Sequence, residues 1–372
     1  MDWLVFGDDW GAHPSTTQHL VRNLPYEDRV VYVNSIGMRS PGLGDLGRAG
    51  AKLGGAMGLR SGQALPFDPT RLQVVEPRVL PWHRSRAAQA INRRSLAASI
   101  RPALDALGIR EAVALLSNPV ASLYLAGLPI RKVGYLRLDD YARLPGVDSS
   151  LVTPLDAAMC RDADVVIATA ESLLPAGRGE AGQYLPQGVD FDHFAAVPMV
   201  LPDASDRVLG FFGLIAEWLD FALIDAVSQA CPDWTLELIG PIRHLPPGIR
   251  RLANVFIRPP VAYEDLPAEL RRWRAAWVPF QVSELTQGVN PLKVREYLAA
   301  GLPSASTPIP EVRGLAPWVA VCRDAAEIAA WLSGEVASDS PARRAERRES
   351  VRSHSWAARA ARLRSFFGGS AT

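Results

Sequence analysis

The stretch GVNPLKVREYLAAG, residues 288–301, holds the side chains whose types and spacing most clearly indicate chemistry. Asn290 followed by Pro291 is typical of an N-cap and a first helical position, so a helix is predicted to begin here. Lys293 and Glu296 then lie three residues apart on one face of that helix. The unpaired N–H groups and partial positive charge of a helix N-terminus can bind a phosphate, and a lysine in the first turn would strengthen that site.

Glu296 suits a different part of a ligand. A carboxylate one turn deeper would repel a phosphate, but it could accept hydrogen bonds from the two hydroxyl groups of a ribose. Phosphate at the helix tip and ribose behind it would together describe a nucleotide. The alternative is a surface ion pair between Lys293 and Glu296, worth on the order of a few tenths of a kcal/mol, and the helix rules alone leave both interpretations open.

Short runs rich in Val, Ile and aromatic residues alternate with helix-like stretches, which predicts two α/β units with parallel sheets covered on both faces. In the first half the predicted strands are 3–7, 29–35, 72–77, 112–117, 133–138, 164–169 and 183–188. In the second half they are 208–215, 235–242, 255–260, 275–281, 304–309 and 319–324. Two such units should enclose a cleft, and ligands of parallel sheets bind beyond the carboxyl ends of the strands. The residues that follow each strand are therefore the candidates for a site.

The chain of 372 residues is long enough for two domains. A stretch rich in Pro, Asp and Ala near 195–207 lacks periodicity and is a candidate linker. We therefore expect a first domain over 1–195, a second over 196–350, and a helical segment over 351–372. The glycine-rich stretch 40–63 is expected to be a loop.

Bulk composition narrows the functional class. A net charge of +1 gives no electrostatic case for binding nucleic acid. The three cysteines are far apart, which argues against a disulfide framework or a zinc site and suits a reducing compartment. The start of the sequence lacks the basic region and apolar core of a signal peptide, and no run suits a transmembrane helix. These features predict a cytoplasmic protein.

The segment PLKVREYLAAGLPSASTPIPEV, residues 291–312, resembles the carboxyl-terminal signature of GT-B glycosyltransferases, in particular the retaining family 4. Further segments occur in the order of that family: 6–20, 133–141, 163–174, 185–194 and 210–220. The resemblance implies a GT-B fold with two Rossmann-like domains, an acceptor domain and a donor domain, and a C-terminal helix that crosses back onto the first. It also implies transfer of a sugar from a nucleotide-diphosphate sugar with retention of anomeric configuration, without a metal or other cofactor.

The resemblance assigns the donor to the second domain. The helix start at Asn290, Pro291 and Leu292 would stabilise the leaving diphosphate together with Lys293, the expected catalytic cation. Glu296 would hold the ribose.

The donor side departs from the family in two places. Where the family usually has a second glutamate, this chain has Gly288, and either Glu284 or the backbone amides around Gly288 and Val289 could replace it. The family often places basic residues after the first strand of the second domain, but 213–220 contains none. Gly213 would still let a phosphate approach the backbone.

Two further positions fall where such proteins hold the nucleobase. Gly240 follows a predicted strand, and Tyr263 lies in the turn VAYEDLP. The Tyr263 ring could stack on the base or could be a packing residue.

On the acceptor side, Gly11 and His13 follow the first strand. His13 is expected to be catalytic by bonding the transferred sugar or the acceptor hydroxyl, or else to cap the following helix. Asp9 would bind acceptor hydroxyls or cap its turn, and Asn118, after the strand 112–117, would face the acceptor.

Asp139 and Asp140 end the strand 133–138 and resemble an acidic pair of related transferases. Asp139 is expected to bind the acceptor and Asp140 to be catalytic, with turn capping as the alternative. Paired acids beside a nucleotide could also hold Mg²⁺ or Mn²⁺. GT-B enzymes generally hold the pyrophosphate with a helix dipole and basic side chains instead, so no metal is expected.

Arginines cluster in HRSRAAQAINRR, residues 83–94, on the expected acceptor domain. Such a surface could lie on anionic lipid at the cytoplasmic face of the inner membrane, or could be an ordinary solvated helix face. Membrane contact would suit a lipid-linked saccharide acceptor in exopolysaccharide or cell-envelope synthesis. Two other functions share the architecture, a hydrolysing sugar-nucleotide epimerase and a non-catalytic nucleotide-binding relative.

Overall fold

The computed structural model describes residues 1–12, 15–38, 68–144, 146–177, 179–203 and 205–368. The chain forms two compact units, Met1–Pro186 with Arg359–Thr372, and Gln187–Ala358. His13 and the predicted loop 40–63 lie outside the described residues. The other predicted elements can be compared with the structure.

The units divide at different residues from those we expected. The first boundary lies between Pro186 and Gln187 rather than at 195, because Val189 and Phe194 are buried in the core of the second unit. Val351 belongs to that same core, so the returning segment begins at Arg359 rather than at 351. The side chains at both places are apolar, and burial rather than chain composition decides the boundary.

The first unit is built on a seven-stranded sheet in the order β3-β2-β1-β4-β5-β6-β7, in which every neighbouring pair is parallel. Its strands are β1 (Asp2–Phe6), β2 (Arg29–Val33), β3 (Leu72–Val75), β4 (Ala112–Leu116), β5 (Ile130–Arg137), β6 (Val165–Ala168) and β7 (Gly182–Tyr184). The central strands are buried on both faces, as continuous apolar runs require. Each strand predicted in the first half is confirmed.

Three helices of this unit begin at side-chain caps. They are α1 (Thr16–Arg22), α3 (Arg86–Ala106) and α4 (Ser149–Asp162). Their N-cap side chains, Ser15, Ser85 and Asp148, each accept a hydrogen bond from a backbone N–H in the first turn. Ser15 is thus the N-cap residue of α1, and both interpretations of His13 concern a residue outside the described ranges.

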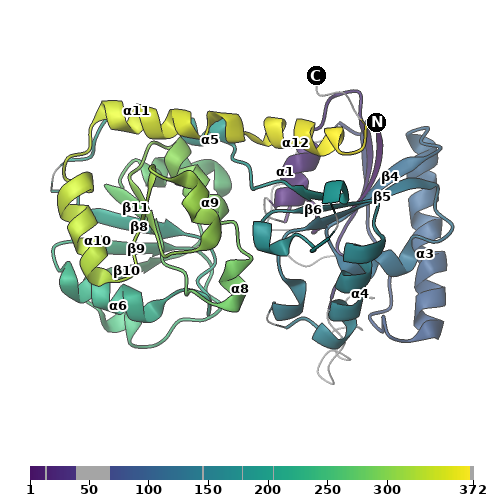
Figure 1. Cartoon of the computed structure of the whole chain (residues 1–372), viewed down its shortest axis with the longest axis horizontal. Coiled ribbons are helices and arrows are strands. Elements are labelled where there is room, and N and C mark those ends of the chain that lie inside the picture. The colour runs from purple at the N-terminus through teal and green to yellow at the C-terminus, as the bar shows by residue number, and fades with distance from the viewer. Residues whose placement is uncertain (13–14, 39–67, 145, 178, 204, 369–372) are drawn as a thin grey trace. The chain divides into compact units, whose positions relative to one another are not determined.

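The second unit has a six-stranded sheet in the order β10-β9-β8-β11-β12-β13, again parallel throughout. Its strands are β8 (Val208–Phe212), β9 (Thr235–Ile239), β10 (Val255–Arg258), β11 (Ala275–Val278), β12 (Ser304–Ser306) and β13 (Val319–Val321). The helices are α5 (Phe191–Ala195), α6 (Phe221–Ala230), α7 (Leu266–Leu270), α8 (Glu284–Gln287), α9 (Leu292–Ala299), α10 (Ala325–Trp331) and α11 (Pro341–Ser350). Figure 1 shows α6, α10 and α11 around this sheet. The strands predicted in the second half are confirmed.

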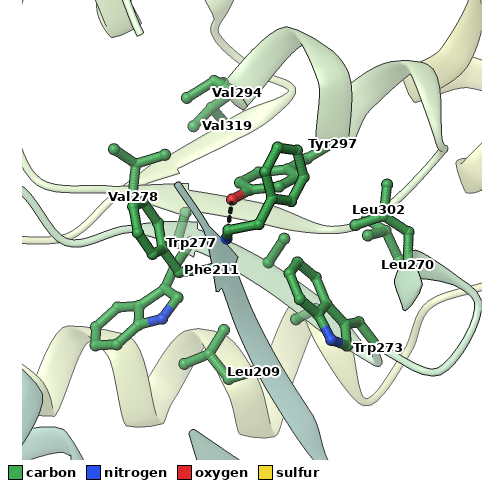
Figure 2. Close-up of a cluster of buried hydrophobic side chains, with 14 of the residues drawn as sticks. Leu209, Phe211, Leu270, Trp273, Trp277, Val278, Val294, Tyr297, Leu302 and Val319 are labelled. Atoms are coloured by element: carbon green, nitrogen blue, oxygen red, sulfur yellow. Dashed lines mark hydrogen bonds between the residues drawn. The ribbon is translucent and has the colours of Figure 1, made fainter. Parts of the chain in front are cut away.

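A dense apolar cluster fixes α9 against the sheet (Figure 2). Tyr297 of α9 is fully buried, and its hydroxyl accepts a hydrogen bond from the Phe212 N–H at the end of β8 (3.2 Å). The indole of Trp273 packs against the backbone of Gly210, where a Cβ would collide with the ring. Since Lys293 and Glu296 lie on the same helix as Tyr297, this packing sets their position relative to the carboxyl end of β8.

The last helix, α12 (Trp356–Ser365), begins in the second unit and ends in the first. Within the first unit, Phe367 packs edge-on against Trp3 (5.4 Å between ring centroids), and Arg364 pairs with the buried Asp28 (3.2 Å). In the part of the chain that is described, no helix has the length and apolarity needed to cross a membrane.

Candidate functional site

The first turn of α9 is open at its N-terminus. Its N-cap is Pro291, which has no side chain able to cap it, and the helix starts at Leu292. The expectation that Asn290 is the cap is wrong, because its side chain bonds elsewhere. The Asn290 amide donates to the Glu311 carboxylate (2.9 Å) and accepts a hydrogen bond from Arg295, all three side chains being buried. The helix N-terminus therefore keeps the open N–H groups that an anion needs.

Gly213, Gly240 and Lys293 meet at the carboxyl edge of the second sheet. Lys293 lies across Gly213, where a Cβ would collide with Lys293 Cε and lie 3.2 Å from its Nζ. A Cβ at Gly240 would in turn collide with the Gly213 carbonyl oxygen. Both glycines have a positive φ, 144° and 151°, which other residues rarely adopt. These three residues were predicted separately from the sequence. In the structure they lie together at the sheet edge, with the lysine ammonium group beside the glycine backbone.

Lys293 and Glu296 do not form the surface ion pair that was the alternative to a nucleotide site. Among the described residues, Lys293 makes no ion pair and the Glu296 carboxylate has no hydrogen-bond partner. Glu296 is only 4% exposed. Burial raises the pKa of its carboxyl from 4.5 to about 7, with Lys293 lowering the pKa and Asp190 raising it. A buried carboxyl without a partner is costly, and the two hydroxyls of a ribose would satisfy it.

Asp190 was not predicted from the sequence as a site residue. It lies just before α5 in the second unit, close enough to Glu296 to raise the pKa of that carboxyl. It lies within 185–194, one of the segments that carry the resemblance. The motif as a whole, rather than Asp190 by itself, was therefore the sequence feature that could have indicated this residue.

The groups that could replace the family's second glutamate, which is Gly288 here, differ in their surroundings. The N–H groups of Gly288 and Val289 both donate to carbonyl groups of α8, at 3.3 Å to Leu285 and 3.2 Å to Thr286. These amides are used in ending α8, so the expectation that they serve the donor sugar is not met by this geometry. Glu284 is exposed in the first turn of α8 and stays the side-chain candidate.

Tyr263 has a packing role. Its ring stacks on His193 (4.6 Å between centroids, 13° between planes) and meets Phe194 edge-on (5.8 Å). His193 Nε2 is also 2.9 Å from the Tyr263 carbonyl oxygen, to which the ring N–H donates. The sequence left stacking on a base and packing open, and packing is what the described contacts show.

At the carboxyl edge of the first sheet, the turn after β1 is held by side chains. Gln18 accepts from the Gly11 N–H (3.1 Å) and donates to the Asp9 carbonyl (3.0 Å). The Asp9 carboxylate accepts from the Ser35 N–H (3.0 Å), so it anchors the turn as the capping alternative predicted. The Tyr32 hydroxyl donates to the carbonyl of Asp8, an exposed residue. Gln18 is a positioning residue that its sequence context did not reveal.

The two acids after β5 have different surroundings. Asp140 pairs with Arg143 (2.9 Å) on the surface, which speaks for a local structural role rather than the catalytic one we expected. Burial raises the pKa of Asp139 from 3.8 to about 7, with smaller contributions from the charges of Asp8 and Asp140. Asp139 is therefore the better candidate for handling a proton or an acceptor hydroxyl on this unit.

Asn118 follows β4 at the carboxyl edge of the first sheet. The Asn118 side-chain oxygen accepts from the Val120 N–H (2.9 Å), and the residue is 8% exposed. Its side chain thus caps the 3₁₀ turn that follows β4. No group of three or more His, Cys, Asp or Glu side chains suited to a metal ion occurs among the residues described.

A cavity of about 670 Å³ lies at the opposite edge of the second sheet, beside residues that precede strands. Arg207, Cys231 and Arg274 are among its lining residues, and none of the predicted donor residues is. The cavity is therefore separate from the candidate site.

Comparisons with known proteins bear on the fold. No family model matches the chain. Over 173 residues it is 30% identical to TuaH of Bacillus subtilis strain 168, a candidate teichuronic acid biosynthesis glycosyltransferase, and this match spans 43% of the chain and 42% of TuaH. Among solved structures, Anabaena HepE in complex with UDP and glucose is similar at a TM-score of 0.63 and 14% identity, covering 99% of both chains. Sucrose-phosphate synthase from Thermosynechococcus elongatus is similar at 0.60 and 13%, covering 99% of this chain and 98% of that one. The chain therefore has the GT-B fold.

Proposed function

We propose that the chain is a glycosyltransferase that transfers a sugar from a nucleotide-diphosphate sugar to a saccharide or lipid-linked saccharide. The observation that carries the proposal is the arrangement of Gly213, Lys293 and Glu296 at one sheet edge beside an uncapped helix start. The name of TuaH supports a role in cell-envelope glycan synthesis, and the UDP bound to HepE supports a UDP-sugar donor.

The chemical problem is the negative charge that develops on the leaving diphosphate. In this site, the α9 N-terminus and the Lys293 ammonium would stabilise that charge from fixed positions. Removing one preorganised donor from such a site typically costs about 2.7–4 kcal/mol of transition-state stabilisation. Because the second unit supplies this positive charge itself, we propose that the reaction needs no metal. Activity that survives EDTA would support this, and activity restored only by Mg²⁺ or Mn²⁺ would reject it.

We also propose retention of anomeric configuration. In a retaining reaction the leaving phosphate can take the acceptor proton, so the donor side needs no separate base. Asp139 would then bind the acceptor hydroxyl rather than remove its proton. The anomeric configuration of the product, read by NMR from coupling constants, decides this directly.

The first test is a binding test. Calorimetry with UDP, uridine, GDP and ADP should show a preference for a diphosphate over the nucleoside. Lys293→Met should remove most of that preference while leaving uridine binding nearly unchanged. Equal affinity of the unchanged protein for UDP and uridine would contradict a diphosphate site at α9.

A non-catalytic nucleotide-binding relative is the second candidate function, favoured by one observation. Gly288 stands where the related transferases have a glutamate, and its N–H is used to end α8. A UDP-sugar that binds but is never consumed, with or without saccharide acceptors, would identify this function. Consumption without an acceptor, with a free epimerised sugar as product, would instead identify a hydrolysing epimerase.

A further inference from the structure

The chain has two arginine-rich helices, and their arginines differ in what they contact. In α11, Arg344 and Arg347 are 1% and 2% exposed and both bond the buried Asp339 carboxylate, at 2.8 and 2.7 Å. Arg348 donates to the Ala299 carbonyl at the end of α9 (3.0 Å). These arginines hold the second unit together and are not available to a partner.

The arginines of α3 and of the turn before it face solvent. The exposed ones in this segment are Arg84, Arg86, Arg93, Arg94 and Arg101. Within the part of the chain that is described, none of them forms an ion pair. Three make one hydrogen bond each, to the hydroxyl of Ser150 and to the carbonyls of Leu123 and Gly127. The sequence from residue 83 to residue 104 contains no Asp or Glu, and the single acidic residue of α3 is Asp105 in its last turn, four residues after Arg101.

Apolar side chains lie among these arginines. Ile91 is 52% exposed and Trp82, which precedes the N-cap Ser85, is 46% exposed. The face of α3 that packs inward consists of Ala88, Asn92, Leu96, Ile100 and Leu104, spaced by four. Ile91, Arg94 and Arg101 are spaced by three and seven, which places them together on the outward face. Figure 1 shows α3 as an unbroken helix along the sheet of the first unit.

We propose that the outward face of α3, formed by Ile91, Arg94 and Arg101, docks on a membrane rich in anionic lipid together with the exposed Trp82 and Arg86 at the N-terminal end of this segment. Unpaired guanidinium groups would bind lipid phosphates, and each basic residue near such a surface contributes on the order of a threefold to tenfold gain in affinity. Tryptophan and isoleucine would enter the region between headgroups and acyl chains.

The exposed apolar residues favour lipid over nucleic acid as the partner. A phosphate backbone offers nothing for Ile91 to contact, and the chain as a whole has a net charge of only +1. The inference does not depend on the proposed transfer reaction, because none of the candidate donor or acceptor residues lies on α3. It can therefore hold even if the chemistry is different.

Co-sedimentation of the full chain with lipid vesicles tests the charge part of the proposal. Vesicles of equimolar phosphatidylglycerol and phosphatidylcholine should bind the protein, more weakly as salt rises, and phosphatidylcholine vesicles should not. The double change Arg94→Glu with Arg101→Glu should weaken binding at least roughly tenfold. Arg313→Glu with Arg343→Glu is the matched control, since both arginines are exposed in the second unit, and it should change affinity less than about twofold.

A fluorescence experiment tests the apolar part. Of the tryptophans in the described chain, only Trp82 falls in the exposed class. Lipids brominated on the acyl chain should therefore quench part of the emission on binding, and Trp82→Phe should remove most of that quenching. Circular dichroism and thermal unfolding of each variant show whether it is folded.

Three results would overturn the proposal. They are no binding to the anionic vesicles, an equal loss of binding in the Arg313 and Arg343 control, and binding without quenching of Trp82. Tight binding to DNA of the unchanged protein, lost in the Arg94 and Arg101 variant while vesicles are ignored, would identify a nucleic acid surface instead.

Discussion

Lys293 lies across the backbone of Gly213, so closely that a Cβ at residue 213 would collide with the lysine Cε. The glycine follows β8 and the lysine lies in the first turn of α9, about eighty residues further along the chain. The Gly213 N–H is bonded to the Ile239 carbonyl (2.8 Å), so the glycine cannot move aside without breaking the sheet edge. The glycine is therefore needed both for its own backbone conformation and for the position of the lysine.

Gly213→Ala should cost far more activity than an ordinary glycine substitution. The residue has a φ of 144°, and forcing a Cβ into such a conformation costs roughly 1–3 kcal/mol. It would also displace Lys293 from the diphosphate, so we expect sugar transfer to fall at least roughly tenfold. Steady-state rates and thermal unfolding measure the two effects separately.

Gly248→Ala is the matched control for that change. Its φ is −61°, and a Cβ there would have nothing within 4 Å. Stability should be unchanged or raised by up to about 1 kcal/mol, with normal activity. If Gly213→Ala behaved in the same way, the contact with Lys293 would have no functional importance.

Lys293→Ala and Glu296→Ala should each lower donor turnover at least roughly tenfold, which is a loss of about 1.4 kcal/mol of transition-state stabilisation. The fold should survive both changes, because the cluster around Tyr297 holds α9 (Figure 2). The two variants should differ in calorimetry: Lys293→Ala should weaken UDP but not uridine, whereas Glu296→Ala should weaken both. Near-normal turnover in both variants would reject the roles given to these residues.

The sequence predicted the second sheet and the parts of this site better than it predicted the details of α9. Continuous apolar strands and helix-like stretches between them are local signals, and the strands follow them. Gly213 and Gly240 were expected separately because each follows a strand, and only packing shows that they touch. Asn290 had the pattern of an N-cap, but its buried hydrogen bonds to Glu311 and Arg295 depend on residues that the local sequence does not identify.

The acceptor side was harder to predict for a different reason. Asp139 and Asp140 are adjacent and look equivalent in the sequence, but one is half-buried near Asp8 and the other pairs with Arg143. Their difference arises from the turn after β5, which no pattern of residue types specifies. The observed domain boundaries differ from the predicted ones for a related reason. Phe194 and Val351 belong to the core of the second unit because of how they pack, which composition does not show.

The stability of the second unit should depend on pH through Glu296. Its pKa is about 7 in the folded protein and close to 4.5 when unfolded, so the folded state binds more protons between these values. The stabilising effect of its protonation is complete below about pH 4.5 and is lost as the pH rises through about 7, an effect on the order of 3 kcal/mol. Glu296→Gln should remove this part of the slope when unfolding free energies are measured across that range. An unchanged slope would mean that Glu296 is ionised in the free protein.

Nucleotide binding should have the opposite dependence on pH. The ionised carboxylate accepts both ribose hydroxyl hydrogen bonds, whereas the protonated form has less acceptor capacity. UDP affinity should therefore rise as the pH increases through about 7 in the unchanged protein. Glu296→Gln should bind UDP more weakly and without that rise, and a 2′-deoxyribose analogue should behave similarly with the unchanged protein. A rise of the same size in the glutamine variant would assign the pH effect to another group.

The roles of Asp139 and Asp140 can be distinguished by replacing each residue with asparagine. Asp139→Asn should reduce transfer to an acceptor at least roughly tenfold and flatten the pH profile of turnover near pH 7, because burial and Asp8 raise the pKa of Asp139 to about that value. Asp140→Asn should leave the profile in place and alter the rate less than about threefold, since it removes only an exposed ion pair with Arg143. UDP binding should be normal in both variants, because these residues belong to the first unit and the donor residues to the second. A loss of activity confined to Asp140→Asn would restore the expected catalytic role of that residue and leave Asp139 with a structural role.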